Sequence, residues 1–269
     1  MHKAISNIAW TKEEDEKMYP IMTQYGFQGL EIAPSRIWAD PTHVSQNSIR
    51  DFQNKLHEYQ ITVIAMQAIL FGKQELTIFE NPEIKLKTSQ YIKKTIDLAS
   101  NLDVQILVFG SPKNRLTYGK DKTEIDKISI EFFNMIGDYA KSKNTLFCIE
   151  PNPPEYGADF ITNVSEAISL VKNVNNSGFR LHLDLGAMTI NKEDYVKCIT
   201  SSKPFLSHFH ISEPYLHPIS ETESKHEIVD DALKNINYQG WVSIEMKSNN
   251  VGNNIQTVTQ AMQIVSKYY

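Results

Sequence analysis

The sequence predicts a protein of the α/β class in which eight parallel strands close into a (β/α)₈ barrel, as a single domain over residues 1–269. Short, nearly continuous apolar runs alternate with amphipathic helical stretches along the whole chain, which is typical of a parallel sheet covered by helices. Eight such units in about 250 residues suit a closed barrel. No Pro/Gly/Ser-rich linker or low-complexity tract divides the sequence.

The first half of the chain contains four strand–helix units. Runs such as ITVIAMQ and VQILVFG are mainly apolar, as buried strands are. The helical stretch that begins at Pro82 carries its proline in the first turn, where the missing N–H is tolerated. Strands are expected at Lys3–Trp10, Phe27–Ala33, Ile61–Gln67 and Val104–Gly110, and helices at Lys12–Tyr25, Ser45–Tyr59, Pro82–Ser100 and Lys122–Ser142.

The second half repeats the pattern four more times. Its apolar runs are LFCIE, FRLHLD, FLSHFH and WVSIE. Asn163 heads a helical stretch as a residue that favours the capping position. Strands are expected at Thr145–Glu150, Phe179–Asp184, Phe205–Ile211 and Trp241–Met246, and helices at Asn163–Val174, from about Lys192, at His226–Ile236 and at Asn253–Tyr269.

An open, doubly wound sheet is the alternative fold. The first strand-to-helix turn, NIAWTKEE, has no glycine-rich phosphate fingerprint, and this favours the barrel. In a barrel, the loop Pro214–Lys225 follows a strand and therefore lies on the face where active sites are built.

Composition excludes several classes of function. The 27 Lys and Arg against 32 Asp and Glu give a net charge of −5, without the basic balance of a nucleic-acid-binding surface. Two cysteines are too few for a disulfide framework or a Cys-rich zinc site. Neither a signal peptide nor a membrane-spanning run is apparent. We expect a cytoplasmic protein with no nucleic-acid or membrane partner.

Each of the last four apolar runs ends in a metal-binding side chain. These residues are Glu150, Asp184, His210 and Glu245. Because parallel strands end at the same rim of a barrel, we expect three carboxylates and one imidazole to converge there. Oxygen ligands suit Mg²⁺ or Mn²⁺, and the added imidazole favours Mn²⁺ or Co²⁺. Mn²⁺ is therefore the expected metal, with Mg²⁺, Co²⁺ or Zn²⁺ as alternatives.

With these motifs the chain resembles the xylose isomerase-like barrel superfamily, and within it the sugar isomerase/epimerase group that includes tagatose and psicose epimerases. The segments that carry the resemblance are IEPN, HLDLG, FHISEP and NYQGWVSIE, together with GLEI on the second strand. The order Glu, Asp, His, Glu on strands five to eight is the metal set of that group. The resemblance spans nearly the whole chain.

The resemblance implies the chemistry. A metal-bound sugar or sugar derivative would be isomerised or epimerised by proton transfer through an enediolate, with Glu150 and Glu245 as the acid/base pair and as ligands. Asp184 and His210 would act as ligands only. The group carries a histidine three residues after the aspartate and an arginine six after the histidine, and these positions are Ala187 and Leu216 here.

Several residues are candidates for binding the substrate. Glu31 closes the second strand at the rim, and Asn152 directly follows the strand that ends in Glu150. Cationic residues near strand ends could hold a phosphate or carboxylate, and aromatic or sulfur side chains could form a wall of the pocket. The full set is Glu31, Asn152, Lys113, Arg115, Lys247, Trp10 and Met66. His182 and His208 compete with His210 as ligands, and the histidine at the strand end is favoured.

Other functions remain as alternatives. A dehydratase of a cyclitol or keto-sugar would use the same enolate and expel a hydroxyl. An AP endonuclease of the same superfamily would need extra histidines, and Ala187 occupies one of their positions. A binding protein with a relic site would lack catalysis. The expected partner is a small sugar or sugar derivative, and the resemblance implies a homodimer or homotetramer.

Overall fold

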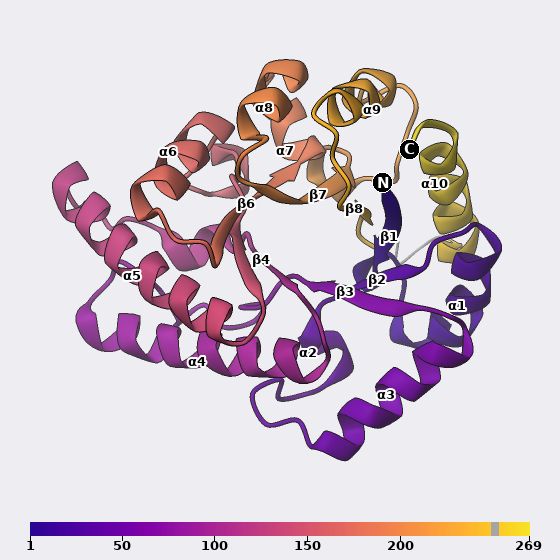
Figure 1. Cartoon of the computed structure of the whole chain (residues 1–269), viewed down its shortest axis with the longest axis horizontal. Helices are drawn as coiled ribbons and strands as arrows, with labels where there is room; N and C mark the ends of the chain where they lie inside the picture. Colours follow the sequence, from indigo (N-terminus) through magenta and orange to yellow (C-terminus); the bar gives the residue numbers. More distant parts are fainter. Residues whose placement is uncertain (249–252) are drawn as a thin grey trace.

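The predicted barrel is present in the computed structural model, which describes residues 1–248 and 253–269 (Figure 1). Parallel strands pair with their neighbours in chain order, and β8 closes the ring against β1. The strands are β1 (His2–Ser6), β2 (Gly29–Ile32), β3 (Thr62–Met66), β4 (Ile106–Phe109), β5 (Leu146–Ile149), β6 (Phe179–Asp184), β7 (Leu206–Ser212) and β8 (Trp241–Glu245). The prediction of a single-domain (β/α)₈ fold is therefore confirmed.

Helices form the outer layer around the strands (Figure 1). The longer ones are α1 (Asp15–Gln24), α3 (Gln46–Glu58), α4 (Pro82–Asn101), α5 (Lys122–Ser142), α6 (Val164–Val174), α8 (Tyr195–Ser202), α9 (His226–Asn235) and α10 (Asn254–Tyr268), and the short ones are α2 (Pro34–Ile37) and α7 (Leu185–Ile190). The Asn163 side chain caps α6, as its position predicted. Within the described ranges, no helix is long and apolar enough to cross a membrane.

Two predicted boundaries are wrong. The first strand does not reach Trp10, because the Ser6 side chain accepts a hydrogen bond from the backbone N–H of Ile8 and starts a 3₁₀ turn. The helix expected from about Lys192 is α8, which begins at Tyr195, and a further helix, α7, precedes it. Asp184 and Asp194 cap them through their carboxylates, which satisfies N–H groups that have no partner inside a helix.

Aromatic packing fixes β5 and β6, the strands that lead to the predicted site. Phe133 of α5 stacks on Phe179 of β6 with ring centroids 4.7 Å apart, and its ring also meets Phe147 of β5. All three side chains are buried. Cys148 points to the other side of β5, into a small inner cluster with Ile106 and Val108. This packing sets the direction in which the two strand ends leave the barrel.

Candidate metal centre and active site

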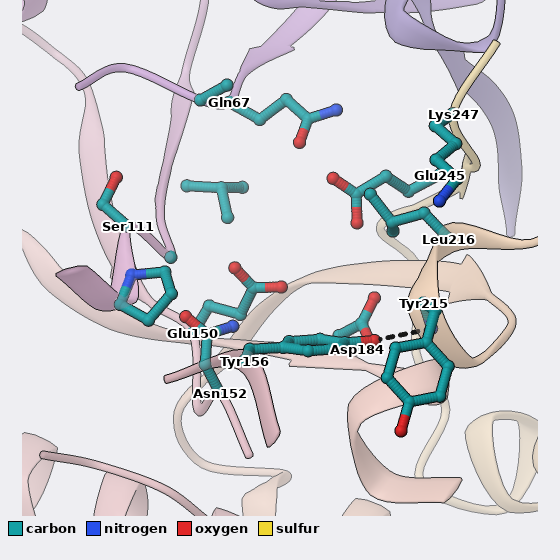
Figure 2. Close-up of a pocket in the computed structure, with 14 residues that line it drawn as sticks. Gln67, Ser111, Glu150, Asn152, Tyr156, Asp184, Tyr215, Leu216, Glu245 and Lys247 are labelled. Atoms are coloured by element: carbon teal, nitrogen blue, oxygen red, sulfur yellow. Dashed lines mark hydrogen bonds between the residues drawn. The ribbon is translucent and has the colours of Figure 1, made fainter. Parts of the chain in front are cut away.

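Four strand ends bring the predicted ligands together at one rim of the barrel. Glu150 directly follows β5, Asp184 ends β6, His210 lies in β7 and Glu245 ends β8. All four side chains are buried, and the carboxylates line a cavity of about 470 Å³. Figure 2 shows Glu150 and Glu245 reaching toward each other across this cavity. Its other lining residues are Gln67, Ala68, Val108, Gly110, Ser111, Pro112, Asn152, Tyr156, Tyr215, Leu216 and Lys247, with Asp184 at its base.

The candidate ligand atoms lie close together. His210 Nδ1 is 3.1 Å from Glu245 Oε2 and 3.8 Å from Asp184 Oδ2. His182 Nε2 lies 3.9 Å from Glu150 Oε1. Ligand atoms of Glu150, His182, Asp184 and His210 all fall within 4.8 Å of one another. The cluster therefore includes a second histidine in addition to the predicted one.

Glu31 fixes the orientation of His210. The carboxylate lies 3.0 Å from His210 Nε2 and 3.3 Å from His208 Nε2, and all three side chains are fully buried. His210 Nδ1, on the other side of the ring, faces the acids: Glu245 Oε2 lies 3.1 Å away, but no aligned hydrogen bond forms among the described residues. Histidines that bind a metal through one ring nitrogen usually donate the N–H of the other nitrogen to a carboxylate. Glu31 holds this position behind His210, whose second nitrogen faces the acids.

Asp184 has two roles at once. Its Oδ1 accepts a 2.6 Å hydrogen bond from the Ala187 N–H and so caps α7. Its Oδ2 accepts a 2.5 Å hydrogen bond from the Ser212 hydroxyl and faces His210. The capping and ligand roles of this residue are thus compatible, because each uses a different oxygen.

Glu150 is held by its surroundings on two sides. The buried Arg115 Nη2 donates 2.7 Å hydrogen bonds to the backbone oxygen of Glu150 and to Asn152 Oδ1. On the other side, Gly110 leaves the space that the carboxylate fills, since a Cβ there would overlap Glu150 Oε2. The backbone at this strand end is therefore held by Arg115, and the absence of a side chain at Gly110 leaves room for the carboxylate.

The electrostatics of the cluster disfavour the charged forms of two of its carboxylates. Burial, together with Glu245 and Asp184, raises the pKa of Glu150 to about 8. Burial and Glu245 likewise raise the pKa of Asp184 to about 6. Burial opposes the charged form of Glu31, but His210 and His208 outweigh it and hold the pKa of Glu31 well below its ordinary value. Burial and neighbouring negative charge favour the protonated form of a carboxylate, so a bound cation would stabilise these anions.

The donor set fits a divalent cation. Ligand atoms of Glu150, Asp184 and His210 lie within 4.8 Å of one another, and Glu245 Oε2 lies 3.1 Å from His210 Nδ1. Carboxylate and imidazole donors suit Mn²⁺, Co²⁺ and Zn²⁺, with Mg²⁺ favoured by the oxygens. Glu150, Asp184, His210 and Glu245 would hold the ion.

The substrate-binding candidates are distributed differently from the prediction. Asn152 and Lys247 line the cavity, and Leu216 lines it at the position where the resemblance implies an arginine. Glu31 lies beneath His210 instead of in the cavity, and Arg115 lies behind Glu150.

Three more candidates lie away from the cavity. Lys113 is exposed on a 3₁₀ turn. Trp10 is buried and donates a 2.7 Å hydrogen bond to Asp15 Oδ1. Met66 is fully buried in the hydrophobic core. Apolar packing and a local hydrogen bond thus account for the positions of the two large side chains.

Sequence reasoning missed the wall of the cavity that two tyrosines form. Tyr156 lies in the loop after β5 and Tyr215 in the loop after β7. The Tyr215 N–H donates a 2.8 Å hydrogen bond to the Tyr156 hydroxyl, and the rings meet edge to face (Figure 2). Both follow strand ends, which is the only signal that the sequence offered for them.

Several residues that line the cavity have strained backbone conformations. Four of its non-glycine lining residues have positive φ: Ala68, Ser111, Tyr215 and Leu216 at 50°, 43°, 61° and 57°. Such conformations cost on the order of 1 kcal/mol or more each and persist where the surroundings impose them, often at functional sites. The loops around the cavity are therefore held in unusual conformations.

Comparison with known proteins places these features in context. A family described as xylose isomerase-like TIM barrel matches residues 21–268. A D-psicose 3-epimerase of Agrobacterium fabrum is 27% identical over 244 residues, which cover 88% of this chain and 81% of that protein. The crystal structure of a D-psicose 3-epimerase with D-fructose superposes with a TM-score of 0.83 at 17% identity, covering 99% of this chain and 98% of the other. A 3-keto-D-glucoside 4-epimerase from E. coli gives 0.81 at 16% identity, covering 99% of both chains.

Proposed function

Because the chain belongs to the xylose isomerase-like TIM barrel family, we propose that it is a divalent-metal-dependent epimerase or isomerase of a sugar or sugar derivative. The observation that carries this proposal is the convergence of Glu150, Asp184, His210 and Glu245 at one rim, with two glutamates on opposite sides of a cavity. The similarity to a D-psicose 3-epimerase over most of the chain supports it. We propose Mn²⁺ as the metal.

The two glutamates would carry out the proton transfers. A divalent cation bound at the cluster would polarise the carbonyl of the sugar and stabilise negative charge on its oxygens. One glutamate then removes the proton from the carbon next to the carbonyl, and the other returns a proton. Since Glu150 and Glu245 reach into the cavity from opposite sides, return to the opposite face of the same carbon gives epimerisation. Return to the neighbouring carbon gives isomerisation.

The remaining lining residues suit a sugar. Gln67 and Asn152 place amide groups along the cavity, and Lys247 places an ammonium group at its rim. Arg115 occupies the Oδ1 atom of Asn152, so the NH₂ group of that amide is the end that can meet a hydroxyl. Tyr156 offers an apolar ring face together with its hydroxyl, a combination that suits one face of a sugar ring.

Solvent isotope exchange tests the proposal. The protein with Mn²⁺ is incubated in D₂O with a panel of ketoses and aldoses, and products are analysed by NMR and mass spectrometry. We expect deuterium at the carbon next to the carbonyl in a substrate and its epimer or isomer. Glu245→Gln should slow exchange by roughly 10²- to 10⁴-fold, the usual contribution of a general acid or base.

Glu155→Gln is the matched control, because Glu155 is an exposed glutamate in the loop near the cavity. It should retain the exchange rate of the unchanged protein. Full activity of Glu245→Gln would refute the acid/base assignment. A product that has lost the mass of water would identify a dehydratase instead, and absence of exchange with every sugar would favour a binding protein.

A further inference from the structure

His182 is a buried histidine that takes no part in the proton transfers or the four-residue metal site proposed above. It lies in β6, two residues before Asp184, and its side chain is fully buried. Neither ring nitrogen has a hydrogen-bond partner among the described residues. Most buried polar atoms in native proteins are satisfied, so an exception calls for an explanation such as an absent ion. Its neighbour His208 differs, because His208 Nε2 is paired with Glu31.

The ring of His182 lies against the metal cluster. Its Nε2 is 3.9 Å from Glu150 Oε1, and its ring centroid is 4.1 Å from that of His210, with the rings edge to face. Two ligands with bonds of about 2.1 Å to one ion can be at most about 4.2 Å apart. The separation of His182 from Glu150 satisfies this limit, as does the 3.8 Å between His210 and Asp184.

An irregularity in the sheet puts His182 in this position. Between β6 and β7 the register shifts after Leu181, which pairs with Leu206, so that His182 pairs with His208 and Ser207 is skipped. Without the shift, His182 would lie beside Ser207. Such bulges often occur next to active sites, where they redirect side chains.

We propose that His182 is a further ligand of the divalent metal, beside Glu150, Asp184, His210 and Glu245. This inference rests on the proposed metal-dependent function. A second imidazole gives the site two nitrogen donors and makes it more suitable for Co²⁺ or Zn²⁺ than an oxygen-rich set with one histidine. It also supplies an imidazole nitrogen near the end of β6, the strand that precedes Ala187, where the resemblance implies a histidine.

X-ray absorption spectroscopy of the protein loaded with Co²⁺ alone, without a sugar, tests this. Scattering from imidazole rings reports how many histidines bind the metal. We expect two histidines in the unchanged protein and one in His182→Leu, with the affinity of the variant for Co²⁺ at least roughly tenfold weaker. The loss of affinity for Mg²⁺ should be smaller. His226→Gln is the matched control, since it replaces a buried histidine that contacts Glu213 outside the cluster and should leave two histidines on the metal.

The outcomes separate this inference from the proposed function. One histidine on Co²⁺ in the unchanged protein overturns the role of His182 and leaves the four-residue site intact, even if His182→Leu fails to fold. Absence of any bound divalent metal overturns both. Two histidines in the unchanged protein and one in His182→Leu support the additional ligand.

Discussion

Replacing Glu31 by glutamine should weaken metal binding although Glu31 does not line the cavity. In the native protein its carboxylate lies 3.0 Å from His210 Nε2 and 3.3 Å from His208 Nε2. The glutamine oxygen can accept from one of these groups, while its NH₂ group faces the other. His210 then loses the charged acceptor that orients its ring and makes Nδ1 a better donor to a metal.

The size of the effect follows from this geometry. Loss of a partner behind a metal-bound histidine commonly costs about 10- to 100-fold in metal affinity, which corresponds to about 1.4–2.7 kcal/mol. The metal-free protein should also unfold more easily, because the buried pair of Glu31 and His210 is broken. We expect both changes in Glu31→Gln, measured by competition with a chromophoric chelator for Co²⁺ and by thermal unfolding.

Glu213→Gln provides the comparison. Glu213 is also fully buried and lies 3.2 Å from a histidine, His226 Nε2, while it accepts a hydrogen bond from the Ser224 hydroxyl. This variant should lose stability but keep its Co²⁺ affinity within about threefold, a change of less than 1 kcal/mol. Native affinity in Glu31→Gln, or an equal loss in Glu213→Gln, would refute the orienting role of Glu31.

Three further predictions concern the carboxylates and the metal that they would bind. In Gly110→Ala the new Cβ would overlap Glu150 Oε2 and displace the carboxylate. Because a displacement of about 1 Å can cost 10²-fold in rate, we expect the rate of deuterium exchange to fall by at least roughly tenfold. An unchanged rate would contradict this prediction. In the metal-free protein the pKa values of Glu150 and Asp184, about 8 and about 6, exceed their ordinary values of 4.5 and 3.8. The folded state then binds more protons than the unfolded state, so stability should fall as pH rises from about 5 to 8. Thermal unfolding across this range tests it, and Co²⁺ at 100 times its Kd should add about 2.7 kcal/mol.

The sequence predicted the convergence of four strand-end residues better than it predicted their surroundings, for a physical reason. Parallel strands place their ends at one rim, so the identity of four strand-end residues was enough to bring them together. The role of Arg115 depends on a contact with Glu150 across 35 residues, and that of Glu31 on a contact with His210 across 179. No local pattern reports such contacts. The same holds for Tyr156, whose position depends on the path of a loop.

The aspartate that precedes the short helix α7 fits two structural roles. Aspartate at the end of an apolar strand predicts either a ligand or a cap, and the sequence does not separate these. In the structure Asp184 caps α7 with one oxygen and turns the other toward His210. The short helix thus fixes the rotation of the carboxylate, and the position of Ala187 is set by that hydrogen bond.

The charges of the site are consistent with a base beside the proposed metal. A divalent ion bound at the cluster and the buried guanidinium of Arg115 would contribute three positive charges. A histidine that binds the metal through Nδ1 is neutral, so His210 adds none. Four buried carboxylates oppose them, and one net negative charge would remain at the site when the histidines are neutral: the carboxylates are Glu31, Glu150, Asp184 and Glu245. Glu31 and Asp184 are fixed by hydrogen bonds from other side chains or the backbone. The unbalanced charge is thus left to the two glutamates that face the cavity, where it can accept a proton from a substrate carbon.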